Sequence, residues 1–251
     1  MSTVITIDGP AACGKGSVAK QLATMFNFHY LESGLIYRAV ALLILQYFID
    51  HKIKLDKIRK ISTIITNSSD SLSNLLPSIN NNIDNIMRLI RNTQFNIIDN
   101  KILINNINIS WLVKGETMGL IASFYSKIPE IRQELIELQR SFEHPPGLIA
   151  DGRDMGSVIF PKANLKIFLT ADLETRALRA YNRYQHLAHT SQNFSYDDIL
   201  KKIKTRDHQD SNRKHARLSY DDSYLFIDNS HLSLQETVDL IKIELEQSCL
   251  V

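Results

Sequence analysis

The segment GPAACGKGS, residues 9–17, constrains the fold more than any other part of the sequence. It contains three glycines and a lysine, and it fits the pattern G-x-x-x-x-G-K from Gly9 to Lys15. A β-branched run at residues 3–7 precedes it, and residues 17–26, with apolar side chains at helical spacing, follow it. Such a strand–loop–helix unit directs backbone N–H groups and a helix N-terminus at one point. The sequence therefore predicts a phosphate-binding loop.

The hydroxyl of this loop stands one position later than the strict pattern requires. Gly16 follows Lys15, and Ser17 carries the hydroxyl that would bind Mg²⁺. A predicted strand precedes the loop and a predicted helix follows it, as in a phosphate loop, so we keep the prediction although the hydroxyl is shifted by one position. Cys13 lies in the same loop, just before the helix N-terminus. It is either a thiol activated by the helix or a small buried residue.

Strands and helices alternate through most of the rest of the chain. Further strands are predicted at residues 28–33, 147–151, 165–171 and 224–229, and helices at residues 35–50, 128–142, 172–188 and 233–247. This alternation favours a parallel sheet with helices on both faces. Asp151 ends one of these strands and Arg153 follows it, at the edge where open α/β sheets bind their ligands.

Composition changes in the middle of the chain, where asparagine and serine become frequent and aromatic residues are scarce. Residues 66–94 are interpreted as a loosely selected surface segment. Residues 95–109 contain apolar runs broken at two polar turns, which predicts a small antiparallel meander. The predicted domains are a core, residues 1–66 and 114–251, and an inserted monophosphate-binding subdomain, residues 67–113.

The overall composition excludes several classes of function. The net charge of the 251 residues is only +2, which provides no global field for nucleic acid or an anionic membrane. The N-terminus has no basic region followed by a long apolar run, and the most apolar stretch, residues 40–49, is far too short to span a bilayer. Two cysteines favour a reducing compartment over a disulfide framework, so we expect a cytoplasmic protein.

A phosphate loop by itself leaves kinases, ATPases, GTPase switches and nucleotide-regulated binding modules open. Arg176, Arg179 and Arg183 are spaced three and four residues apart, so they share one face of a predicted helix. Phosphoryl transfer depends on positioning and charge neutralisation, for which arginines are suited. The sequence contains neither a guanine-reading N-K-x-D nor a convincing Ser-His-Asp or Cys-His arrangement.

Five motifs in order resemble those of the bacterial-type cytidylate kinases, a family of nucleoside monophosphate kinases. They are VITIDGPAACGKGS, LESGLIYR, PGLIADGRDMGSVIFP, KIFLTA and KTRDHQDSNR, and the resemblance spans about residues 3–229. It implies a P-loop kinase core with a parallel sheet flanked by helices, a small β-rich insert and a helical lid over about residues 172–215. It also implies transfer of the γ-phosphoryl group of ATP to CMP or dCMP with Mg²⁺, in pyrimidine nucleotide metabolism.

The resemblance also implies roles for individual residues. ATP would bind Gly9, Pro10, Ala11, Ala12, Cys13, Gly14, Lys15, Gly16 and Ser17. Mg²⁺ would be held by Ser17 directly and by Asp151 through water. The catalytic residues would be Lys15, Asp151, Arg176, Arg179 and Arg183. The monophosphate substrate would contact Ser33, Tyr37, Arg38, Arg132, Arg153, Asp154, Arg206, Asp210 and Arg213.

The chemistry of three of these residues suits cytosine, whose N4 amine donates where O4 of uracil accepts. Asp154 and Ser33 can accept from N4, and Arg132 can donate to O2 or N3. Two features depart from the family pattern: Lys114 stands where an arginine is usual, and residues 66–94 are longer than the usual connection.

Two alternatives stay open at this point. One is a kinase for another small acceptor, such as UMP or a non-nucleotide hydroxyl compound. The other is a nucleotide-regulated binding module, against which the segment DGRDMG and the arginine-rich helix argue. The expected partners are small molecules only, CMP, dCMP and ATP, and the expected state is a monomer.

Overall fold

The computed structural model describes residues 2–48, 76–98, 101–113, 116–186, 195–211 and 218–250. The chain divides into two compact units, Met1–Glu32 with Arg140–Val251, and Ser33–Gln139. The first unit contains β1 (Thr3–Asp8), α1 (Lys15–Phe26), β2 (His29–Glu32), β6 (Gly147–Gly152), the π-helical turn η1 (Met155–Ile159), β7 (Leu165–Thr170), α10 (Leu173–His186), α11 (Tyr196–Ser211), β8 (Tyr224–Asp228) and α12 (Leu234–Gln247). The second contains α2 (Ser33–Phe48), α5 (Leu76–Asn81), α6 (Ile83–Arg91), β3 (Phe95–Ile98), β4 (Lys101–Ile104), β5 (Ile107–Asn108), α7 (Ser110–Val113), α8 (Glu116–Tyr125) and α9 (Pro129–Arg140).

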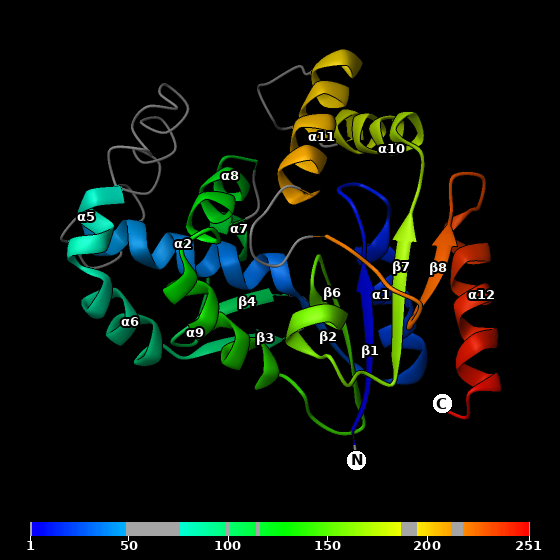
Figure 1. Ribbon diagram of the computed structural model, residues 1–251, viewed down its shortest axis with the longest axis horizontal. Helices are drawn as coiled ribbons and strands as arrows, with labels where there is room; N and C mark the ends of the chain where they lie inside the picture. Colours follow the sequence, from blue (N-terminus) through cyan, green and yellow to red (C-terminus); the bar gives the residue numbers. More distant parts are fainter. Residues whose placement is uncertain are drawn as a thin grey trace. The chain divides into compact units, whose positions relative to one another are not determined.

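The first unit is built on a five-stranded sheet in the order β2-β6-β1-β7-β8, visible in Figure 1. Every pair of neighbouring strands in it is parallel. β1 and β6, at the centre, are buried along almost their whole length, as expected for strands covered on both faces. The predicted strands of this sheet are confirmed, and their register places Asp8 and Asp151 at the carboxyl ends of adjacent strands.

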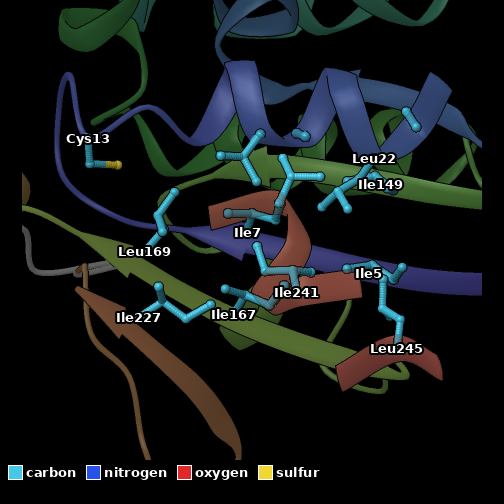
Figure 2. Close-up of a cluster of buried hydrophobic side chains, with 14 residues drawn as sticks. Ile5, Ile7, Cys13, Leu22, Ile149, Ile167, Leu169, Ile227, Ile241 and Leu245 are labelled. Atoms are coloured by element: carbon cyan, nitrogen blue, oxygen red, sulfur yellow. The ribbon is translucent and has the colours of Figure 1, made fainter. Parts of the chain in front are cut away.

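Helices α1 and α12 pack against each other and cover the hydrophobic core of this unit. Figure 2 shows that core, in which Ile5 and Ile167 of the sheet lie near Ile241 of α12. A capping box at Ser233 begins α12, since its side chain and that of Glu236 bond each other's backbone N–H. The predicted class, a parallel sheet flanked by helices, is confirmed.

Helices α10 and α11 pack against each other and lie beyond the carboxyl end of β7 in Figure 1. The periodicity of residues 172–188 predicts α10 correctly. No periodicity predicted α11, although it lies within residues 172–215, where the resemblance implies a helical lid. No helix in the described ranges is long and apolar enough to cross a membrane.

The second unit combines helices with a three-stranded antiparallel sheet in the order β3-β4-β5. This sheet confirms the predicted meander. Asn105 and Asn106 form its second turn with positive φ angles of 49° and 64°, a conformation that asparagine tolerates. Helix α2 packs against α6, α7, α8 and β4, which explains why it is apolar nearly all round.

The interpretation of residues 66–94 as a loosely selected surface segment is wrong for its described part. α5 and α6 lie there, and Ile79, Ile86 and Ile90 are fully or almost fully buried. The apolar residues of α6 recur three to four residues apart, a helical pattern hidden by the many asparagines around it. The second compact unit also includes α2, α8 and α9, so it is larger than the predicted insertion at residues 67–113.

Candidate active site

The loop between β1 and α1 has the backbone geometry of an anion-binding turn. Ala12 and Gly14 adopt positive φ angles of 60° and 96°, a conformation in which neighbouring N–H groups converge. Gly9 allows the loop to approach β7 closely, because a Cβ atom there would overlap the carbonyl oxygen of Leu169. Among the described residues no side chain caps the start of α1, so the positive end of that helix is left for an anion.

Lys15 is the first residue of α1 and is only 8% exposed. Its Nζ atom donates a hydrogen bond to the carbonyl oxygen of Pro10 at 3.0 Å, so the ammonium group folds back over its own loop. Burial, and next the positive charge of Arg153, lower the pKa of Lys15. A buried ammonium group of this kind favours a ligand that brings negative charge.

Asp151 lies near the end of β6 and is almost fully buried. The hydroxyl of Tyr30 donates to its Oδ1 atom at 2.7 Å, while Oδ2 is 3.7 Å from the position that a Cβ on Gly16 would take. Burial raises the pKa of Asp151, and the charge of Lys15 opposes this rise. Tyr30 thus holds one oxygen of the carboxylate and leaves the other toward the first turn of α1. Nothing in the sequence pattern singled out Tyr30.

Two oxygen donors near the loop fit a magnesium ion. The side chain of Ser17 is exposed on the first turn of α1, toward which Oδ2 of Asp151 is directed. In the described part of the chain, no group of three or more His, Cys, Asp or Glu side chains forms a metal cage. Mg²⁺ accepts such a sparse set, because it keeps several waters and is completed by substrate phosphates.

Asp8, which the sequence did not single out, anchors the segment after β6. Its carboxylate accepts hydrogen bonds from the backbone N–H groups of Met155 and Gly156 at 2.9 and 2.8 Å and from the hydroxyl of Tyr224 at 3.4 Å. A Cβ on Gly156 would come within 2.7 Å of the hydroxyl oxygens of Thr6 and Tyr224, so any other residue there would displace these side chains. Asp8 therefore fixes the turn that carries the predicted substrate residues just before it.

Arg153 and Asp210, both predicted substrate residues, form an ion pair. Nε of Arg153 donates to Oδ2 of Asp210 at 2.7 Å, and Nη1 donates to the carbonyl oxygen of Gly152 at 3.1 Å. Asp210 is almost fully buried on α11, so the pair connects that helix to the end of β6. Asp154, also buried, precedes η1, and its carbonyl oxygen accepts from the N–H of Val158 at 2.9 Å.

Arg176 on α10 binds both the loop and α11. Its Nη1 atom donates to the carbonyl oxygen of Ala11 at 3.1 Å and to Oδ2 of Asp207 at 2.5 Å, and its Nε atom donates to the carbonyl oxygen of Ala171 at 2.9 Å. Oδ1 of Asp207 in turn accepts from the N–H of Ala11 at 3.4 Å. Asp207 is thus a further residue of the site; it lies in the quoted motif KTRDHQDSNR, but its role could not be read from the pattern.

Arg179, one turn along α10, holds the other side of the loop. It donates to the carbonyl oxygen of Cys13 at 3.4 Å, to Oδ1 and the carbonyl oxygen of Asn229 at 2.9 and 2.8 Å, and to the carbonyl oxygen of Leu232 at 3.2 Å. Nδ2 of Asn229 donates to the same carbonyl oxygen of Cys13 at 3.1 Å. The turn after β8 therefore supports the phosphate loop through Arg179.

The remaining predicted residues of the first unit lie at its surface or outside the described residues. Arg183 and Arg206 have exposed side chains. The positive charge of Arg206 nevertheless contributes to lowering the pKa of Lys15, after burial and the charge of Arg153. Arg213 lies outside the described residues, as does Lys114 of the second unit.

The predicted residues of the second unit make three separate contacts within that unit. Ser33, the first residue of α2, donates from Oγ to Oε1 of Gln139 at 2.6 Å. The guanidinium group of Arg132 lies over the ring of Tyr37, 5.9 Å from its centroid. Nη1 of Arg38 donates to the carbonyl oxygen of Val113 at 3.1 Å. Gln139 was missed by the sequence reasoning.

Cys13 resolves one of the alternatives left by the sequence. Its side chain is completely buried in the core cluster near Ile7 and Leu169, and Figure 2 shows it at the loop end of that cluster. A thiol that reagents cannot reach is not the reactive group considered in the sequence. Of the two interpretations, an activated thiol and a small buried residue, the burial of Cys13 supports the second.

Comparison with known proteins identifies relatives along nearly the whole chain. Residues 5–247 match the profile of the family described as cytidylate kinase. A cytidylate kinase of Polynucleobacter necessarius subsp. necessarius is 38% identical over 95% of this chain and 96% of its own, and one of Proteus mirabilis is 36% identical over 94% and 92%. A more distant one, of Fusobacterium nucleatum, is 29% identical over 97% of both chains. A shikimate kinase structure from Bacteroides thetaiotaomicron covers 97% of this chain and 98% of its own with a TM-score of 0.40 and 10% identity, too low a likeness to argue from.

Proposed function

The chain belongs to the cytidylate kinase family, and we infer from this membership that it is an ATP-dependent kinase of CMP and dCMP. It transfers the γ-phosphoryl group of ATP to the phosphate of the acceptor, giving CDP or dCDP and ADP. One observation carries the inference: the family match is continuous over the phosphate loop, the carboxylates at the strand ends and the arginines of α10.

We propose that ATP binds through the phosphates to the loop Gly9–Ser17. The converging N–H groups and the uncapped start of α1 support this role, because both favour an anion. Lys15 would exchange its hydrogen bond with Pro10 for the β- and γ-phosphates, which relieves the cost of burying its charge.

Mg²⁺ would be held by Ser17 directly and by Asp151 through water. The orientation of Asp151, with one oxygen bonded to Tyr30 and the other toward α1, is consistent with this role. When bound, the ion would supply neutralisation of the negative charge on the β- and γ-phosphates.

Arg176, Arg179 and Arg183 would stabilise the transferring phosphoryl group. Arg176 and Arg179 already donate hydrogen bonds to carbonyl oxygens of the loop, so their positive charges lie next to the proposed phosphate site. The part of the chain at about residues 172–215 would be the lid that carries these arginines, with residues 67–113 as the insert near the monophosphate.

The acceptor nucleotide would be recognised by its phosphate, sugar and base. Arg38 and Arg153 would bind its phosphate, and Asp210 would contact the sugar hydroxyls. The other proposed substrate contacts are Ser33, Tyr37, Arg132, Asp154, Arg206 and Arg213. For the base, Asp154 and Ser33 would accept from N4 of cytosine and Arg132 would donate to O2 or N3.

In the reaction, an oxygen of the CMP phosphate attacks the γ-phosphorus while the bond from that phosphorus to the bridging oxygen of ADP breaks. No covalent enzyme intermediate is required, so the side chains act by position and charge. Lys15 and the arginines hold the phosphates in line and neutralise the charge on the transferred oxygens.

A coupled assay of ADP release with CMP, dCMP, UMP, AMP and GMP tests the proposal. We expect rapid turnover with CMP and dCMP only. A preference for UMP or for a non-nucleotide acceptor would replace the substrate, and slow turnover that is independent of any acceptor would indicate a nucleotide-regulated binding module. We also propose a monomer that acts in the cytoplasm.

A further inference from the structure

We propose that Gln139 is a specificity residue, which acts by fixing the hydroxyl proton of Ser33 so that this hydroxyl can only accept a hydrogen bond from the base. The inference rests on the proposed function, because it assumes that Ser33 meets the exocyclic group of the pyrimidine. It adds a residue that has no role in the motifs and makes no contact with the base itself.

Gln139 is completely buried near the end of α9, and the orientation of its amide is determined by its neighbours. Its Nε2 atom lies 2.9 Å from the carbonyl oxygen of Leu135. A carbonyl oxygen can only accept, so the NH₂ group of the amide must face Leu135. The carbonyl oxygen of the amide, Oε1, must then face Ser33.

The same reasoning fixes the proton of Ser33. Oγ of Ser33 lies 2.6 Å from Oε1 of Gln139, and both residues are buried. Because Oε1 can only accept, the single hydroxyl proton of Ser33 is used in this bond. What Ser33 offers to any ligand is therefore a lone pair, and only a ligand that donates can bond to it.

This polarity separates cytosine from uracil. The N4 amine of cytosine donates and completes the chain of hydrogen bonds from the base through Ser33 and Gln139 to Leu135. O4 of uracil would meet the lone pairs of Ser33, with two acceptors opposed. A free serine hydroxyl would not discriminate, since it could rotate and donate to O4. Sites that leave a buried polar group unpaired in this way reject the wrong substrate strongly.

The test compares kcat/KM for CMP and for UMP in Gln139→Met, Ser33→Ala and the double variant. Methionine has nearly the size and shape of glutamine but cannot accept the serine proton. We expect Gln139→Met to lower the ratio of CMP to UMP by about tenfold, chiefly through faster turnover of UMP. Ser33→Ala should lower the same ratio, and Gln139→Met should change it no further in the Ser33→Ala background. The ratio does not depend on the fraction of folded enzyme, because both substrates are assayed on one preparation.

Two further variants control for a purely structural role of Gln139. Gln133→Met changes an exposed glutamine of the same helix and should leave the ratio unchanged. Gln139→Glu keeps an oxygen that accepts from Ser33, so it should retain most of the discrimination. Thermal melts and the KM for ATP identify any general loss of structure.

The inference is overturned if Gln139→Met leaves the ratio unchanged, or if it lowers the ratio equally with and without Ser33. In either case Ser33→Ala would still change the ratio, and the proposed role of Ser33 would survive. If Ser33→Ala itself leaves the ratio unchanged, the proposed role of Ser33 fails, and the inference about Gln139 fails with it.

Discussion

The buried carboxylate of Asp8 has two opposite effects on the free energy of unfolding. Its hydrogen bonds hold the turn after β6, but burial of its charge lowers the free energy of unfolding at neutral pH, and replacing it by asparagine tests this. Burial raises the pKa of Asp8 from an ordinary 3.8 to about 6, although hydrogen bonds from the backbone of Gly156 and Met155 oppose the rise. Between pH 3.8 and about 6, Asp8 keeps its proton in the folded protein but has released it in the unfolded chain. The stability that the proton contributes is fully present below pH 3.8 and is lost as the pH rises through about 6.

The magnitude follows from the difference between the two pKa values. Two pH units correspond to about 3 kcal/mol in the free energy of unfolding, at about 1.4 kcal/mol for each unit. Asparagine does not titrate, and it presents one acceptor and one donor where the carboxylate presents two acceptors. Where Asp8 is ionised, Asp8→Asn therefore loses one of the two backbone hydrogen bonds, which costs about 1–3 kcal/mol.

The assay is urea unfolding of the wild type and Asp8→Asn at about pH 4 and about pH 7. We expect the wild type to lose about 2.5 kcal/mol more than the variant on going from the lower to the higher pH, slightly less than the full difference because the lower pH lies just above the unfolded pKa. Asp239→Asn, at an exposed position on α12, is the matched control and should keep the pH dependence of the wild type. An equal pH dependence in the wild type and Asp8→Asn would refute the reasoning, since the carboxylate would then carry no desolvation cost.

Two further predictions concern the phosphate loop. Lys15→Ala should lower kcat by about 10²–10³ while circular dichroism shows an unchanged fold, because a charge at the transferring group is lost; near wild-type turnover would contradict this role. Of the two cysteines, exposed Cys249 should react rapidly with a thiol reagent and buried Cys13 only after unfolding, so the folded protein should titrate as one thiol. Two fast thiols, with protection of one by ATP, would show that the loop opens around Cys13.

Local patterns predicted much of the fold because they record burial directly. Strands β1, β6 and β7 are largely buried runs rich in β-branched and aliphatic residues, whereas the edge strand β8 buries only Tyr224 and Ile227. The predicted bounds of all four agree with the structure to within about two residues. The order of the strands in the sheet was not predictable in this way, because it depends on which segments pair over distances of more than a hundred residues. α6 was missed because asparagines hid a helical pattern of isoleucines.

Some residues of the candidate site could likewise be predicted from the sequence, and others could not. The phosphate loop and Asp151 are visible in the sequence, since their chemistry lies within a few consecutive residues. Asp8, Asp207 and Gln139 are not visible, because each acts through a partner far away in the chain: Asp8 bonds the backbone 147 residues later, and Gln139 bonds a serine 106 residues earlier. A pattern shows that a polar residue is present, but only the fold shows what it faces.

The sequence predicted only a catalytic role for Arg179, but its contacts indicate that it also stabilises the fold. Its guanidinium group donates to two acceptors of Asn229 at 2.9 and 2.8 Å, as well as to Cys13 and Leu232. Lysine keeps the charge but cannot reach these acceptors together. Since hydrogen bonds from a charged group contribute about 1.5–3 kcal/mol each, Arg179→Lys should lower the free energy of unfolding of the ATP-free protein by about 2–4 kcal/mol. Arg183→Lys, at an exposed position on the same helix, should leave stability nearly unchanged. If Arg179→Lys unfolds like the wild type and loses only kcat, Arg179 acts on the phosphoryl group alone, and its contacts with the loop and the turn after β8 contribute nothing to the fold.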